Sequence, residues 1–133
     1  MVVVDTNVMV YLLVEGDRTR AAQGLLARDP DWRSEGFLLI EFSNVLATYR
    51  RQGALSREQT ERLLGEAERR TRGWVNLPHI QALRLAERYS VSAYDARFLG
   101  AAQILKSRLV TEDARLRAAA PALTMSLDEA LAL

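Results

Sequence analysis

Two short apolar runs of this chain each lead to an aspartate that is followed by a segment with helical character. Residues 2–4 precede Asp5, and residues 109–111 lead to Asp113. Strand and helix signals alternate at short intervals along the chain, which is typical of βα units and a parallel sheet. In such sheets, ligands and catalytic groups gather outside the carboxyl ends of the strands. We therefore expect both aspartates to point into one crevice.

The predicted elements form one α/β domain over residues 1–133, without internal repeats or low-complexity segments. Strands are expected at residues 2–4, 32–34, 74–77, 108–111 and 123–126. Helices are expected at about residues 6–14, 18–28, 37–51, 57–70, 78–89, 94–105 and 112–119, and around Asp128. Ser56 and Gln59 form a capping-box pattern at the start of the fourth helix, and Pro78 suits a first helical turn.

The length of 133 residues fits a single domain with a core of its own. Apolar residues make up 49% of the chain and charged residues 26%, which argues against wholesale disorder. There are no cysteines, so disulfides, thiolate catalysis and cysteine-bound zinc are excluded. The amino terminus lacks a basic signal-peptide region, and its apolar stretch is far shorter than the roughly 20 residues of a membrane span. These features predict a cytoplasmic protein with no membrane partner.

The charge balance does not indicate a strongly basic nucleic-acid-binding domain, because the formal net charge is only +1. All basic residues except Lys106 are arginine, whose planar fork suits bidentate phosphate contacts. Genomic base composition explains this bias equally well. Arginines cluster at residues 50–51 and 69–72, near predicted helix ends. Two explanations stay open for these clusters: contact with phosphate, or solvated side chains that complement the helix dipole.

Two further acids belong to predicted helices. Glu41 interrupts the strongly apolar stretch at residues 37–45, where a carboxylate is unfavourable unless it is paired or binds a metal. Asp95 opens a helix whose small residues at 100–102 allow close approach to the sheet. A metal site at the strand ends would need such acids from neighbouring helices.

Each acid also has a simpler structural explanation. Asp5 and Asp113 are placed to cap the helices that follow them. Asp95 would complement the amino-terminal pole of its helix, and Glu41 would pair with a buried arginine. These explanations stay open for each acid taken alone. Four independent caps need not converge on one crevice, so a convergence of all four would favour a functional site.

Four segments carry these acids: VVVDTNV at the amino terminus, a helix with EFSNVL, the segment SAYDARFLGAAQ, and LVTEDARL near the carboxyl end. In this order and spacing they resemble the PIN domain family, and among its members the VapC-type toxin ribonucleases. The resemblance covers nearly the whole chain. It implies a three-layer α/β/α domain with a mostly parallel five-stranded sheet in the order 3-2-1-4-5.

The same resemblance implies a Mg²⁺- or Mn²⁺-dependent endoribonuclease, the toxin of a type II toxin-antitoxin pair, that leaves a 3′-hydroxyl and a 5′-phosphate. The catalytic and metal-binding residues would be Asp5, Glu41, Asp95 and Asp113, with Asn7 and Thr111 as supporting polar residues. The residue types agree, because clustered carboxylates need a hard cation and Mg²⁺ accepts one or two of them while it retains waters. Glu112 lies beside the fourth acid and leaves that assignment open. One or two metal ions would fit.

The partners implied by the resemblance are an RNA substrate, a cognate antitoxin protein and a second copy of the chain in a homodimer. Arginines near the acids would have to offset the repulsion of phosphate, and the candidates are Arg50, Arg51 and Arg97. Tyr49, Tyr94 and Phe98 offer faces for base stacking, although aromatic residues at helical spacing also suit a core or a dimer contact. The target RNA stays open, as does activity on DNA.

Two other functions are compatible with parts of this pattern. A catalytically silent PIN-like module would bind RNA or protein, but such a module would be expected to lack an acid, and all four are present. A receiver-like phosphoacceptor domain also gathers acids at strand ends, but it needs a lysine after a late strand. The single lysine, Lys106, precedes its predicted strand.

Overall fold

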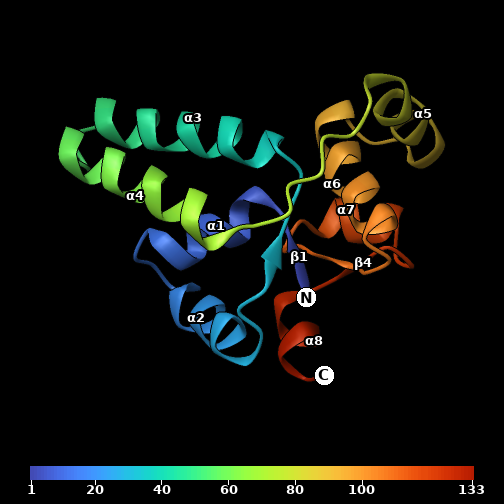
Figure 1. Ribbon diagram of the computed structural model, residues 1–133, viewed down its shortest axis with the longest axis horizontal. Coiled ribbons are helices and arrows are strands. Elements are labelled where there is room, and N and C mark those ends of the chain that lie inside the picture. The colour runs from blue at the N-terminus through green and yellow to red at the C-terminus, as the bar shows by residue number, and fades with distance from the viewer.

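The computed structural model describes residues 1–133 as short parallel strands flanked by helices (Figure 1). The strands are β1 (Val2–Val4), β2 (Trp32–Arg33), β3 (Leu109–Val110) and β4 (Thr124–Met125). The helices are α1 (Thr6–Leu13), α2 (Thr19–Arg28), α3 (Phe37–Arg51), α4 (Arg57–Arg70), α5 (His79–Tyr89), α6 (Ala93–Ile104), α7 (Ala114–Ala119) and α8 (Leu127–Leu131). None of the helices combines the length and the apolar character that a membrane crossing requires.

The strands form one parallel sheet in the order β2-β1-β3-β4. In its centre, Val3 pairs with Leu109 on one side and with Arg33 on the other. This order confirms the predicted arrangement for four of the five strands. The helices flank this sheet as predicted for an α/β domain.

The prediction of a continuous strand at residues 74–77, the third of the five predicted strands, is wrong. The chain reaches the β2 edge through two isolated parallel bridges, between Trp32 and Thr71 and between Glu35 and Val75. Between these bridges Gly73 has a φ of 57°, a left-handed conformation that breaks an extended ladder. The sheet therefore has four strands.

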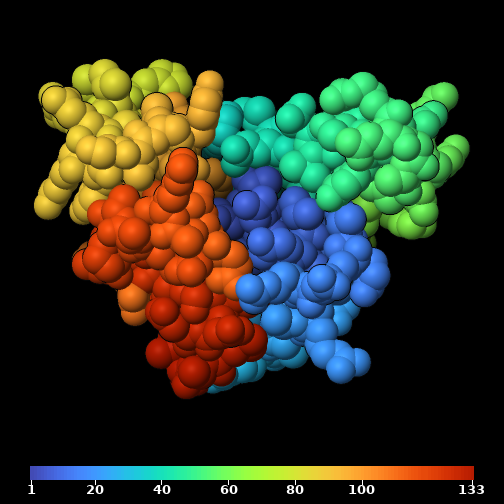
Figure 2. Space-filling view, turned by 180° about the vertical axis from the view of Figure 1, so that it is seen from behind, coloured from blue at the N-terminus to red at the C-terminus, as the bar shows by residue number.

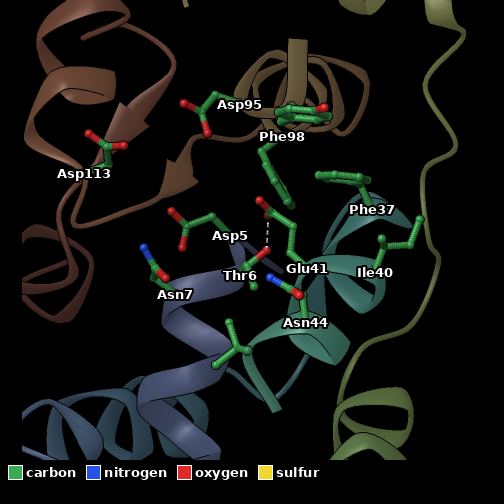
Figure 3. A pocket seen from close by; sticks show the side chains of 12 residues that line it. Asp5, Thr6, Asn7, Phe37, Ile40, Glu41, Asn44, Asp95, Phe98 and Asp113 are labelled. Atoms are coloured by element: carbon green, nitrogen blue, oxygen red, sulfur yellow. Dashed lines mark hydrogen bonds between the residues drawn. The ribbon is translucent and has the colours of Figure 1, made fainter. Parts of the chain in front are cut away.

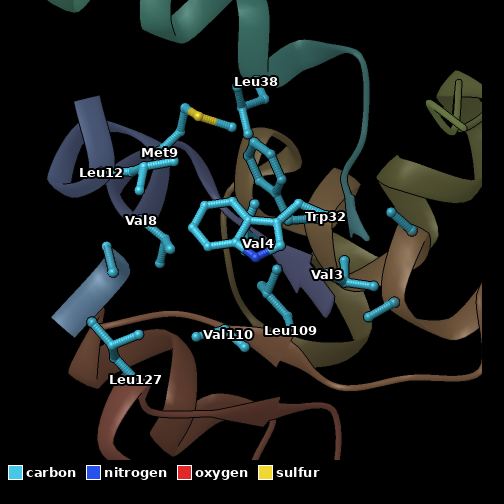
Figure 4. Close-up of a cluster of buried hydrophobic side chains, with 14 of the residues drawn as sticks. Val3, Val4, Val8, Met9, Leu12, Trp32, Leu38, Leu109, Val110 and Leu127 are labelled. Carbon is cyan, nitrogen blue, oxygen red and sulfur yellow. The ribbon is translucent and has the colours of Figure 1, made fainter. Parts of the chain in front are cut away.

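Both faces of the sheet are covered by helices. Successive strand residues point to opposite faces, and Val3 and Val4 are both fully buried. On one face, side chains such as Met9 of α1 and Leu38 of α3 meet the sheet near Trp32 (Figure 4). Helix α6 contacts β1 and β3. The result is the predicted three-layer α/β/α arrangement.

Two helix pairs project from the sheet in different directions (Figure 1). Helices α3 and α4 pack against each other, and α5 packs against α6. The ends of α3 agree with the prediction, and α4 starts at the predicted capping box, in which Ser56 accepts from the Gln59 backbone and the Gln59 side chain accepts from the Ser56 backbone. Residues of α3 and α6, one helix of each pair, line a pocket at the carboxyl ends of the central strands.

Candidate active site

A cleft of about 370 Å³ lies at the carboxyl ends of the central strands, and all four predicted acids line it (Figure 3). Asp5 follows β1, Glu41 belongs to α3, Asp95 to the first turn of α6, and Asp113 precedes α7. The other lining residues are Thr6, Asn7, Phe37, Ile40, Asn44, Val45, Tyr94 and Phe98. Figure 2 shows the surface hollowed where the blue amino-terminal segment meets the teal α3 and the orange segment.

Asp5 is held in place by hydrogen bonds to both of its carboxylate oxygens. The Val8 amide donates to Oδ1 at 3.1 Å, so Asp5 caps α1. The Thr111 hydroxyl donates to Oδ2 at 2.5 Å. Asp5 is only 7% exposed, and this burial raises its pKa to about 6, with smaller increases from the negative charges of Asp95 and Glu41. Asp5 therefore both caps α1 and lines the cleft.

Thr111 connects the first acid to the fourth. Its buried hydroxyl donates to Asp5 and accepts from the backbone amide of Asp113 at 3.1 Å. Asn7 lies in the first turn of α1 with an exposed side chain and lines the same cleft. Both predicted supporting residues thus lie where they can orient an acid or a water molecule.

Glu41 points away from the apolar face of its helix. Its neighbours Leu38 and Phe42 are fully buried in the core, whereas Glu41 is half-buried and lines the cleft. The Thr6 hydroxyl donates to Glu41 Oε1 at 2.6 Å. Burial raises the pKa of Glu41, and the charge of Asp95 raises it further. The alternative partner, a buried arginine, is wrong for this residue.

Asp95 is not the cap of α6. Ser92 occupies that position, and its hydroxyl accepts from the Asp95 amide at 3.0 Å. The Asp95 carboxylate stays in the first turn of the helix and lines the cleft. Burial raises its pKa, and the charge of Asp113 adds to the increase.

Asp113 combines the two explanations that the sequence left open. Its Oδ1 accepts from the amides of Arg115 and Leu116 at 3.0 and 3.1 Å, so it caps α7. It also lines the cleft, where its charge acts on Asp95. The cap fixes the position of the carboxylate at the cleft wall.

Glu112 does not line the cleft. Its carboxylate pairs with Arg18 at 2.6 Å and with Arg117 at 3.3 Å, and it accepts from the Leu127 amide at 3.3 Å. These contacts join the start of α2 to α7 and α8. Asp113 is therefore the acid of this segment that faces the cleft.

The three predicted RNA-contacting arginines lie outside the cleft. Arg50 and Arg51 belong to the carboxyl end of α3, and Arg51 donates to the Thr48 hydroxyl. Arg97 pairs with the buried Glu35 at 3.0 Å and donates to the Leu77 carbonyl at 2.9 Å. No arginine, lysine or histidine lines the cleft. The arrangement brings the acids together without a positive side chain among them.

The mouth of the cleft carries an aromatic pair. The rings of Phe37 and Tyr94 stack with centroids 5.2 Å apart and planes 6° from parallel. Tyr94 is 61% exposed, whereas Phe98 is buried and forms part of the wall. Sequence reasoning missed Phe37, Thr6 and Asn44 as lining residues. Their positions in the sequence could have indicated this role. Thr6 follows Asp5 in the DTN triplet, and Phe37 and Asn44 lie within about one helical turn of Glu41.

The donor set fits a hydrated divalent ion. No three acidic or histidine side chains are close enough to enclose an ion by themselves. Mg²⁺ does not need such a cage, because it binds through one or two carboxylates and keeps several waters. Four carboxylates with no positive side chain beside them match the preference of a hard cation for oxygen. Lys106 is also absent from this cleft, so the phosphate sensor that a receiver-like site would need is missing.

Comparisons with known proteins agree with this architecture. The structure of PAE2754 from Pyrobaculum aerophilum superposes with a TM-score of 0.79 at 18% identity, over 98% of this chain and 91% of that chain. A toxin-antitoxin complex from Klebsiella pneumoniae contains a chain with a TM-score of 0.65 at 20% identity, over 94% of this chain and 97% of that chain. At these identities the likeness concerns the fold. No curated protein matches the sequence.

The family is determined by the sequence itself. The family model described as the PIN domain matches residues 2–121, which include all four acids of the cleft. The match begins within β1 and ends just after α7, so it spans the central strands and both projecting helix pairs. The chain therefore belongs to the PIN domain family.

Proposed function

We propose that this protein is a Mg²⁺- or Mn²⁺-dependent endoribonuclease and the toxin of a type II toxin-antitoxin pair. One observation carries the proposal: Asp5, Glu41, Asp95 and Asp113 line one cleft that contains no positive side chain. Membership of the PIN domain family supports a nuclease. The likeness to a chain of a toxin-antitoxin complex supports the role of a toxin.

The four acids would hold the metal, together with water and substrate oxygens. When bound, Mg²⁺ or Mn²⁺ would lower the pKa of a water molecule and offset the charge that develops on the phosphate. Thr111 would orient Asp5 and Asp113, to which it is hydrogen-bonded, and Asn7 would orient an acid or water through its amide. These residues would keep the acids in place without neutralising them.

Proton transfer would use a carboxylate oxygen that has no protein partner. Glu41 accepts from Thr6 through Oε1, which leaves Oε2 free of protein partners. This oxygen would be placed to take a proton from the attacking water. Attack by water rather than by the ribose 2′-hydroxyl would leave a 3′-hydroxyl and a 5′-phosphate.

The proposed partners are a cognate antitoxin and a second copy of the chain. A nuclease that acts on cellular RNA would work in the cytoplasm and would harm its own cell if left free. An inhibitor that covers the cleft is therefore expected. Co-expression with a neighbouring small gene should yield a complex in native mass spectrometry, and partner-free protein should have the mass of a dimer. Detection of free single chains alone would contradict both expectations.

Total cellular RNA is the substrate that tests the nuclease proposal. Purified, partner-free protein would be incubated with it in Mg²⁺ or Mn²⁺, beside an EDTA sample and the Asp5→Asn variant, and the cut ends would be sequenced. We expect discrete cuts that are lost in both controls. Single-stranded DNA of mixed sequence would be the parallel substrate. Cutting that persists in EDTA or in the variant would contradict the metal-dependent site, and folded protein that cuts neither substrate would favour the silent binding module.

A further inference from the structure

A second groove, of about 570 Å³, lies beside β2 and shares no residue with the acid cleft. Four arginines line it, namely Arg33, Arg69, Arg70 and Arg72, together with Leu26, Pro30, Asp31 and Gly73. The end of α4 and the loop that follows it run beside β2 here (Figure 1), and Thr71 bridges to Trp32. We name this surface the arginine groove. Its position at the start of β2 separates it from the cleft, which lies at the opposite ends of the strands.

Arg33 is held in a fixed orientation with one nitrogen free. Asp31 accepts from its Nε at 2.9 Å and from its Nη2 at 3.2 Å, while Nη1 has no partner. The guanidinium lies directly against the backbone of Gly73, where a Cβ would be 2.9 Å from Nη1. Gly73 also has a left-handed φ of 57°. The left-handed φ favours glycine at this position, and the absence of a Cβ leaves room for the Arg33 side chain beside the loop.

The other three arginines extend this positive surface. Glu66 accepts from Arg69 at 2.6 Å and pairs with Arg70 at 3.5 Å, so one carboxylate orients two guanidinium groups. The exposed Arg72 side chain has neither an ion pair nor a hydrogen bond. Four arginines face two acids, Asp31 and Glu66, which leaves a local charge of +2.

Helix capping does not explain the whole cluster. Arg69 and Arg70 lie in the last turn of α4, where a positive charge complements the helix dipole. Arg33 belongs to a strand, however, and Arg72 lies beyond the helix end. A protein partner is also a poor match, because Leu26 is the only apolar residue of the groove and interface cores are usually rich in apolar and aromatic side chains.

We propose that the arginine groove binds the phosphate backbone of the RNA substrate at a distance from the cutting cleft. This inference rests on the proposed function. Without a metal ion the acids of the cleft repel phosphate, and no arginine lines the cleft, so a positive surface elsewhere would add affinity for RNA. Arginine forks that are oriented by acids but keep free nitrogens suit phosphate oxygens.

Binding would be measured by fluorescence anisotropy with a labelled single-stranded RNA, in EDTA so that no cutting occurs. The test variant is Arg33→Gln with Arg72→Gln. The matched control is Arg57→Gln with Arg84→Gln, which removes the same charge at two positions outside the groove. Both arginines are exposed, and neither forms an ion pair. We expect the groove variant to bind roughly tenfold more weakly at low salt and to reduce the salt slope by about 1.4, since each phosphate contact contributes about 0.7. The control should change affinity by less than twofold.

Arg72→Gln alone keeps the test valid if the double variant folds poorly, because this side chain has no contact to lose. We expect it to weaken RNA binding by about threefold and to reduce the salt slope by about 0.7. Equal RNA affinities of the groove and control variants would overturn the proposal. Unchanged RNA binding together with lost binding of a labelled polyglutamate peptide would also overturn it, in favour of an acidic protein partner.

The outcomes separate this inference from the nuclease proposal. RNA cleavage by the wild type with equal binding by all variants would reject the groove and leave the nuclease intact. Weakened binding by the groove variants, with no metal-dependent cleavage by any protein, would reject the nuclease and retain an RNA-binding groove.

Discussion

Asp5 and Glu35 are both buried carboxylates, but the chain treats them in opposite ways. Glu35 is 3% exposed and pairs with Arg97 at 3.0 Å, while its other oxygen accepts from the Phe37 amide at 2.7 Å. Asp5 is 7% exposed, and its hydrogen-bond donors are uncharged. Its charged neighbours are other acids, which raise its pKa. The comparison shows that a buried carboxylate outside the cleft has a cationic partner, whereas the buried carboxylate of the cleft has none.

Glu112 strengthens this comparison. It lies near Asp113 in the sequence, yet two arginines neutralise it outside the cleft. The chain thus supplies arginines to its structural acids and none to the cleft acids. Burial of an unpaired carboxylate is unfavourable, and such groups cluster at functional sites. A divalent ion would provide the missing positive charge.

The largest effect should follow from breaking the compensated pair. Arg97→Met leaves Glu35 buried without its cation, and we expect the free energy of unfolding to fall by about 3–5 kcal/mol. Urea unfolding monitored by circular dichroism would measure it. The double variant with Glu35→Gln should recover much of the loss, because no charge then stays buried. A loss below about 1 kcal/mol would mean that the pair behaves like an exposed one.

Removal of the Asp5 charge should raise the free energy of unfolding, in contrast to the Arg97 substitution. Its folded-state pKa of about 6 lies above the ordinary value of 3.8, so the folded state binds the proton more tightly than the unfolded state. This contribution to stability is present below the unfolded pKa and is lost as pH rises through about 6. Without metal, Asp5→Asn should therefore stabilise the protein at neutral pH by about 1–3 kcal/mol. Asparagine can still cap α1.

Urea unfolding of the wild type and of Asp5→Asn, in EDTA at a series of pH values, would test this difference in stability. The advantage of Asp5→Asn should shrink as pH falls from 7 to about 4. The same variant should be inactive on RNA. Equal stabilities at neutral pH would mean that Asp5 is not an uncompensated charge.

A smaller effect should follow from Thr111→Val, which keeps the shape but removes the hydroxyl between Asp5 and Asp113. We expect the free energy of unfolding of the metal-free protein to fall by about 1–2 kcal/mol. The hydrogen bond from Thr111 lowers the pKa of Asp5, so its removal should raise that pKa further. Metal binding should then require a higher pH. Serine at this position should restore the wild-type pH dependence, and a valine variant with unchanged pH dependence would contradict the role of the hydroxyl.

The predictions from sequence succeeded where the signals are local. The capping box at Ser56 and Gln59 locates α4, and the apolar runs before Asp5 and Asp113 coincide with β1 and β3. The order of the sheet came from the resemblance to the PIN domain family. The predicted strand at residues 74–77 is not formed, because Gly73 adopts a left-handed conformation between two residues, Thr71 and Val75, that do pair with the sheet edge. Periodicity alone does not reveal a single residue of that kind.

Contacts between distant residues were the part that sequence could not supply. The four acids were identifiable because each follows a strand, opens a helix or interrupts an apolar helix. Glu35 lies 62 residues from its partner Arg97, and no local pattern joins them. Arg97 was a candidate for RNA contact because it lies near Asp95 in the sequence, and its pairing with Glu35 could not be predicted from there. The hydrogen bond that the Thr6 hydroxyl donates to Glu41 was not predicted for the same reason.

Titration calorimetry of Mn²⁺ into partner-free protein tests most directly whether a cation completes the cleft. At neutral pH, where Asp5 is mostly ionised, the wild type should bind Mn²⁺. At a pH of about 5, where Asp5 is mostly protonated, the affinity should fall and binding should release protons. Asp95→Asn, which keeps the side-chain volume, should lose most of the affinity. Absent binding by the wild type, or equal binding by Asp95→Asn, would contradict a metal site built from these uncompensated acids.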